Sequence, residues 1–185
     1  MIKDLEIFRN ENRVTAEEVL RKFKNSIQEI YEDQPDEELD MLVELYAKNP
    51  VDKFIVSKFP TVEVAQGDIL IWAKGTDMYN QNIKRLKNLQ KKNDFILQEN
   101  DSVTGDHKVV PLPNSNISLM IGDFYPALLQ NDLVRSNNKS VKGLILKSDK
   151  SFLIVHREHG NIALPKGEYM ITSQLDPRTL QAMVD

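Results

Sequence analysis

The sequence contains no cysteine. This absence excludes disulfides, a thiol nucleophile, iron–sulfur clusters and every cysteine-based zinc site, so that any metal must be held by histidine, carboxylate or carbonyl groups. Only seven residues are glycine, and none of them forms a GxGxxG or P-loop pattern. No apolar run approaches the ~18 residues that cross a membrane, and the N-terminus lacks the apolar core of a signal peptide. We therefore expect no cofactor and no membrane partner.

Aromatic residues are also few, at 7%, and the net charge is only -4. A weakly acidic chain has no overall field that would recruit nucleic acid or an anionic membrane. Hydrophobic residues make up 41% of the chain, which is enough for a packed core and too many for a disordered protein. A length of 185 residues suits one domain with an appendage or two small domains.

The first third of the chain has the pattern of a helical hairpin. The stretch "TAEE" at Thr15–Glu18 is a capping box, which begins an amphipathic helix predicted over residues 15–32. The segment "EDQPDEE" ends that helix and begins a second one, because acidic residues favour the first turn. Asn49-Pro50 ends the second helix. We predict a helical appendage over residues 1–60.

The character of the sequence changes at Pro60. Short apolar runs separated by turn residues predict many strands, with a polar helix between them over residues 76–94. Asp176-Pro177 predicts the start of a short C-terminal helix. The predicted fold class is α+β: an N-terminal helical hairpin, then a mainly antiparallel β barrel or small sandwich over residues 61–185.

The three histidines of the chain lie in two polar motifs, "TGDHK" with His107 and "HREHG" with His156 and His159. A spacing of three would place His156 and His159 on opposite faces of a strand, so the two rings converge only if "HREHG" is a turn. Three histidines with Asp106 or Glu158 as a carboxylate would then suit zinc, manganese or iron. The interpretation we favour is a hairpin turn in which Gly160 takes a positive φ and no metal is needed.

A second candidate site is the basic segment "IKRLKNLQKK". On a helix it would place Lys84, Lys87 and Lys91 on one face, which could meet phosphates. We favour a solvated helix instead, because no aromatic residue interleaves the lysines to stack on bases.

The C-terminal part resembles a family of short, uncharacterised bacterial and bacteriophage proteins. The matching stretches are "QGDILI" at 66–71, "VTGDHK" at 103–108 and "HREHGNIALPKGEYMITSQLDP" at 156–177. The resemblance covers roughly residues 61–185. The family turn usually carries two histidines separated by one residue, whereas Asp106 and Lys108 occupy those places here. If the family histidines bind a metal, this chain has lost part of that set.

The function we expect is that of a non-enzymatic assembly protein, a capsid-associated structural component of a bacteriophage virion that is present in the host cytoplasm before assembly. The resemblance implies the phage context, and the apolar faces of the helical part suggest binding to other protein subunits. The alternatives are a metal-dependent enzyme or metal-binding sensor that uses His107, His156 and His159, and a small cytoplasmic binding module. The residues predicted to dock on a neighbouring subunit are Leu42, Val43, Tyr46, Phe54, Ile55 and Phe59.

Overall fold

The structure is a computed structural model of the 185-residue chain, and it describes residues 6–9, 12–32, 35–49, 54–57, 63–66, 68–98, 106–126 and 140–174. Within these ranges the fold is α+β, as the sequence predicts. Three α-helices accompany two mostly antiparallel sheets and a separate two-stranded hairpin. The predicted C-terminal helix and Phe59 lie outside the described residues.

The larger sheet has six strands in the order β4-β5-β13-β10-β9-β6. Their bounds are β4 (Glu63–Gln66), β5 (Ile69–Ala73), β13 (Gly167–Ser173), β10 (Val141–Ser148), β9 (Ile117–Phe124) and β6 (Leu86–Lys92). All its neighbouring strands are antiparallel. The predicted strands at β4 and β5, on either side of Gln66-Gly67, are confirmed.

The smaller sheet has five strands in the order β3-β12-β11-β8-β7. Their bounds are β3 (Phe54–Val56), β12 (Gly160–Leu164), β11 (Phe152–His156), β8 (His107–Pro111) and β7 (Ile96–Gln98). β3 pairs with β12 in parallel, and the other neighbours are antiparallel. The two sheets remain separate ladders within the described residues, so closure into a barrel is not confirmed.

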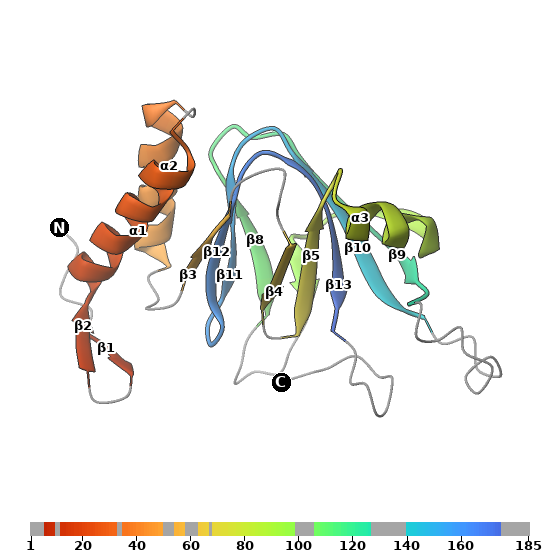
Figure 1. The fold of residues 1–185 in the computed structure, drawn as a ribbon, viewed down its shortest axis with the longest axis horizontal. Coiled ribbons are helices and arrows are strands. Elements are labelled where there is room, and N and C mark those ends of the chain that lie inside the picture. Colours follow the sequence, from red (N-terminus) through yellow and green to blue (C-terminus); the bar gives the residue numbers. More distant parts are fainter. Residues whose placement is uncertain are drawn as a thin grey trace.

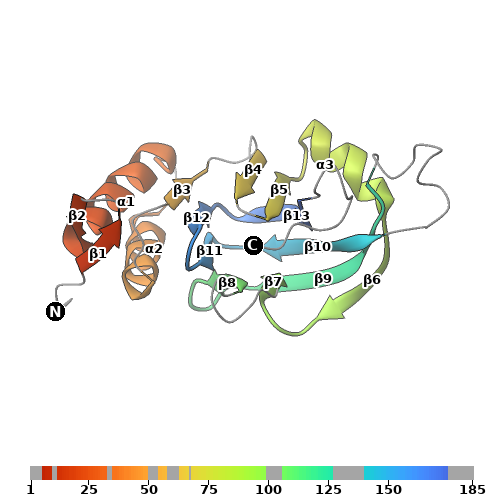
Figure 2. The same ribbon diagram turned by 90° about the horizontal axis from the view of Figure 1, so that it is seen from below.

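The elements form four layers (Figures 1 and 2): the helical hairpin, the five-stranded sheet, the six-stranded sheet, and a short helix on the far side. Side chains alternate between the two faces of a strand, so each sheet supplies two apolar surfaces. The central core lies between the sheets and includes Ile71, Leu146, Phe152, Ile162 and Tyr169.

The helical hairpin consists of α1 (Ala16–Ile30) and α2 (Asp36–Lys48). The predicted cap is confirmed, since the Thr15 hydroxyl accepts a hydrogen bond from the Glu18 backbone N–H at 3.2 Å. The apolar stripes of both helices pack on the outer face of the five-stranded sheet, against Leu153 and Ala163. This packing forms a second core within the same chain.

That second core occupies the surface predicted to dock on a neighbour. Leu42 and Tyr46 are fully buried, and Val43 and Phe54 pack around them. Ile55, on the other face of β3, packs against the central core. The docking role predicted for these side chains is therefore corrected, because the chain's own sheet covers them.

The predicted division of the chain at residue 60 falls between two strands of the fold. β3 lies on the N-terminal side of that division, yet it is the outer strand of the five-stranded sheet. Asn161 on β12 also donates a side-chain hydrogen bond to the Asn49 carbonyl at 2.6 Å. Whether residues 61–185 fold alone remains a prediction, although that fragment would lack both contacts.

The predicted polar helix over residues 76–94 is wrong beyond its first turns. α3 (Asp77–Asn82) begins at the predicted cap Thr76 and is followed by the 3-10 turn η1 (Ile83–Arg85). The chain then becomes strand β6, whose pairing with β9 overrides the helix-like spacing of its leucines.

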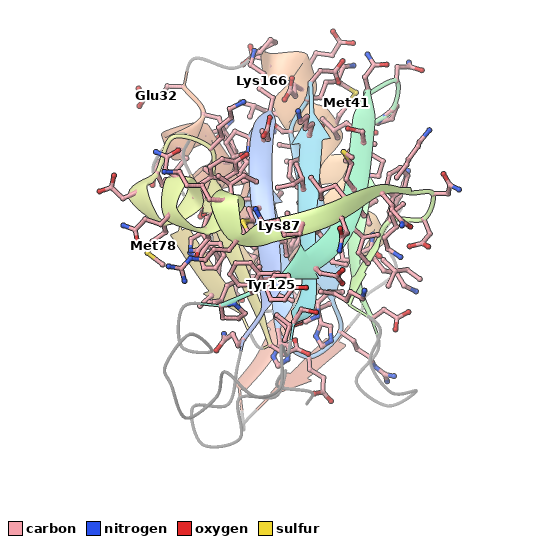
Figure 3. All side chains as sticks on the ribbon, turned by 90° about the vertical axis from the view of Figure 1, so that its right-hand side faces the viewer. Glu32, Met41, Met78, Lys87, Tyr125 and Lys166 are labelled. Atoms are coloured by element: carbon pink, nitrogen blue, oxygen red, sulfur yellow. The ribbon has the colours of Figure 1, made fainter. Side chains whose placement is uncertain are left out.

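This change of structure separates the lysines that we expected on one helix face. Lys87 lies opposite Asp123, but a bulge shifts the register, so Lys91 lies opposite Met120. Residues three apart on β9 point to opposite faces, and so do Lys87 and Lys91. Figure 3 labels Lys87 on β6, the outer strand of the six-stranded sheet. The single basic face with Lys84 does not form, which removes the geometric basis of the predicted nucleic-acid site.

The chain also forms a hairpin that the sequence did not reveal. β1 (Glu6–Arg9) pairs with β2 (Asn12–Thr15) in a sheet of only two strands. It projects from the start of α1, away from the two large sheets (Figure 1).

Among the described residues, no helix is both long enough and apolar enough to cross a membrane.

Candidate functional site

The three histidines meet at one end of the two sheets. β8 begins there with His107, and β11 ends there with His156. β5 begins, and β13 ends, at the same lower edge in Figure 1. The register pairs Lys108 with Val155, so His107 and His156 occupy the next opposed positions. Residues two apart on a strand share a face. Both side chains therefore point inward, because His107 is two residues from the core residue Val109 and His156 is two residues from the core residue Ile154.

The three imidazole rings form a stack, which we call the histidine stack. The ring centroids of His107 and His156 are 4.0 Å apart, and those of His156 and His159 are 4.5 Å apart. The interplanar angles are 19° and 13°, so the rings are nearly parallel. His107 and His156 are buried, at 0% and 2% exposure. The two sequence motifs with histidine are therefore one site in space.

His156 has a defined structural role. Its Nδ1 accepts hydrogen bonds from the backbone N–H groups of Glu158 and His159, at 3.2 and 3.1 Å. The turn ends at Gly160, whose φ is 89°, a conformation that suits glycine. The predicted hairpin turn is confirmed, and β12 begins at Gly160. A nitrogen that accepts two backbone N–H groups carries no proton, so the neutral ring has its proton on Nε2.

Asp68 is a carboxylate beside the stack. It precedes β5 and is fully buried, and its Oδ1 lies 3.4 Å from Nδ1 of His107. Neither ring nitrogen of His107 has a hydrogen bond within the described part of the chain. Burial, together with repulsion from His156 and His159, lowers the pKa of His107 to about 3, and Asp106 opposes this only in part. His107 is therefore neutral at pH 7.

The stacked arrangement is unfavourable for a metal ion. An imidazole binds a metal in its ring plane, at ~2.0–2.1 Å from the nitrogen, and parallel rings do not direct their lone pairs at one point. Nδ1 of His156 is also occupied by the turn. Among the residues that the structure describes, no group of three histidine or carboxylate residues is arranged to hold a metal. A metal-dependent function would require the rings to rotate out of the stack.

The carboxylate predicted for the site was Asp106 or Glu158. The Asp106 side chain pairs with Lys108 at 3.4 Å, and Glu158 contributes a backbone N–H to Nδ1 of His156. Sequence reasoning missed Asp68. The signal available was its position in "QGD", immediately before a buried strand. Only the topology, which brings the start of β5 beside the start of β8, reveals that Asp68 belongs with the histidines.

Comparison with known proteins adds no relative: no family model, no curated protein and no solved structure matches this chain.

Proposed function

We propose that this chain is a non-enzymatic assembly protein that binds other protein subunits, and that it is a structural component of a bacteriophage virion. The observation that supports binding is the β1–β2 hairpin, which forms a sheet of its own. An isolated two-stranded hairpin is marginally stable in water, and among the described residues no third strand pairs with the backbone N–H and C=O groups along its outer edges. A strand of another subunit would satisfy these groups by extending the sheet.

The rest of the fold suits a rigid support for such an arm. The helices that follow the hairpin are fixed to the five-stranded sheet by a buried aromatic cluster, in which Phe23 and Tyr46 stack at 4.0 Å. The arm would therefore be held at a fixed place on the molecule. We further propose that the two facing sheets form a small sandwich. The virion context comes from the resemblance of residues 61–185 to bacterial and bacteriophage proteins.

The test is sedimentation velocity of the full chain, alone and mixed with the proteins encoded beside it. We expect a complex larger than the monomer. Ile7→Pro should abolish it, because proline removes a backbone donor from β1 and disturbs its pairing with Val14. Lys22→Ala on the exposed face of α1 is the matched control and should leave the complex intact. A monomer in every mixture, or a complex that survives Ile7→Pro, would refute the proposal.

A further inference from the structure

The histidine stack places three basic side chains together at a site with few negative charges among the described residues. In the part of the chain that the structure describes, two acidic groups face it: Asp68 just before β5, 3.4 Å from His107, and Asp106 before β8, which acts on His107 through its charge. Lys108, on the same strand as His107, pairs with Asp106 and so reduces its effect. The turn itself carries Arg157 and Glu158, and the paired position on β7 is the uncharged Gln98.

We propose that the histidine stack is a proton-operated switch, which holds the β11–β12 turn closed while its rings are neutral and releases the turn when they take up protons. This inference concerns regulation of the fold and stands apart from the proposed assembly role. It rests on the stacking geometry and on the hydrogen bonds that His156 makes to the turn.

The first step in opening the turn is the loss of the two hydrogen bonds that hold it to His156. Nδ1 of His156 is the acceptor for the N–H groups of Glu158 and His159. A proton on Nδ1 would face these two donors, so both hydrogen bonds would be lost. Because His156 is 2% exposed, water cannot replace these bonds while the turn stays closed.

The second step is repulsion within the stack. Asp68 lies 3.4 Å from Nδ1 of His107, and the ring centroids of His156 and His159 lie 4.0 Å and 5.7 Å from that of His107. Asp68 can balance one imidazolium, but a second proton places two like charges about 4 Å apart in a buried site, where Coulomb repulsion is strong. The imidazoles therefore bind protons more tightly when the turn is open than when it is closed, and more than one proton is bound on opening.

This coupling has a measurable slope. At pH values below the ordinary histidine pKa of about 6.5, each proton bound on opening increases the equilibrium constant for opening about tenfold for every unit by which the pH falls. Two protons give about a hundredfold change per unit. Release is expected in acid, and the closed turn is favoured at neutral pH.

The experiment is amide hydrogen exchange of the full chain between pH 7 and pH 5. For the Glu158 and His159 amides, the exchange rate is divided into that of an unstructured peptide at the same pH to give a protection factor. We expect protection at these two amides to fall about a hundredfold per pH unit in the acid range, while the amides of β10 remain protected. His107→Gln removes one fully buried ring and should reduce the slope to about tenfold per unit. Glu158→Gln is the matched control, because it changes the charge of the turn and leaves all three rings in place.

Four results would overturn the switch. These are protection that does not change with pH, an unchanged slope in His107→Gln, and a loss of protection that occurs equally in β10, which would be global unfolding. The fourth is a stoichiometric transition metal in the purified protein, since bound metal would replace the proton as the cation of the site. A full-strength slope in the Glu158→Gln control is required for the proposal to stand.

Discussion

Removing the Phe23 ring should measure how firmly the helical hairpin is attached to the sheets. Phe23 is fully buried. Its ring stacks on Tyr46 at 4.0 Å and meets the edge of Phe54 at 5.4 Å. It thus joins α1, α2 and the edge strand β3. Phe23→Ala removes these contacts and leaves a cavity, which costs about 3–5 kcal/mol for a buried phenylalanine.

A loss of this size is large against a total unfolding free energy of about 5–15 kcal/mol. In a chain of this length it should lower the melting temperature by about 10 °C, at about 2–4 °C per kcal/mol. Urea unfolding and calorimetry measure both quantities. Lys22→Ala, which removes an exposed pair with Glu18 at 3.2 Å, should change stability by less than about 1 kcal/mol. If Phe23→Ala costs no more than Lys22→Ala, the helical hairpin is not packed as the structure shows.

Four further predictions follow from particular contacts. A fragment of residues 61–185 should be less soluble and less stable than the full chain, because it lacks β3 and the helical cover of Leu153; a fully cooperative, soluble fragment would contradict this. Glu38→Ala should cost about 1–3 kcal/mol in urea unfolding by leaving the Ser151 N–H, bonded to Glu38 at 2.8 Å, without its acceptor, whereas Glu38→Gln should cost less. The pKa of His107 is about 3 in the folded chain and 6.5 without burial, so the unfolded state binds more protons between these values. Unfolding free energy should therefore fall by about 2 kcal/mol from pH 6.5 to pH 5, and this component should be absent in His107→Gln. Gly160→Ala should destabilise by about 1–2 kcal/mol because φ there is 89°, and an unchanged melting temperature would exclude strain at the turn.

The local parts of the fold were predictable because their signals are local. The capping box at Thr15 and the apolar stripes of both helices need only neighbouring residues to be recognised. The strands of the C-terminal part are bounded by turn residues, and Gly160 has the positive φ that its position in the turn suggested. The helix predicted over residues 86–92 was wrong because the structure there depends on contacts that are distant in sequence. Leu86 and Leu89 have helical spacing, but pairing with β9 decides the structure, and the sequence of β6 alone does not contain that pairing.

The candidate site was predictable only in part for the same reason. Convergence of His156 and His159 follows from recognising a turn. The approach of His107 depends on the pairing of β8 with β11, and that of Asp68 on the position of β5 in the other sheet. The interpretation of Leu42 and Tyr46 as docking residues failed because an apolar helix face predicts burial without identifying the surface that buries it.

The parallel pairing of β3 with β12 has a consequence for the order of events during synthesis. α1 and α2 are made early, but the surface that covers them includes β12, and the Asn49–Asn161 hydrogen bond joins positions 112 residues apart. Long-range contacts of this kind form late, since a large loop must close first. The part of the helical surface that packs on Leu153 and Ala163 therefore lacks its cover until β12 has been made. Apolar surface exposed at this stage favours aggregation of a nascent chain.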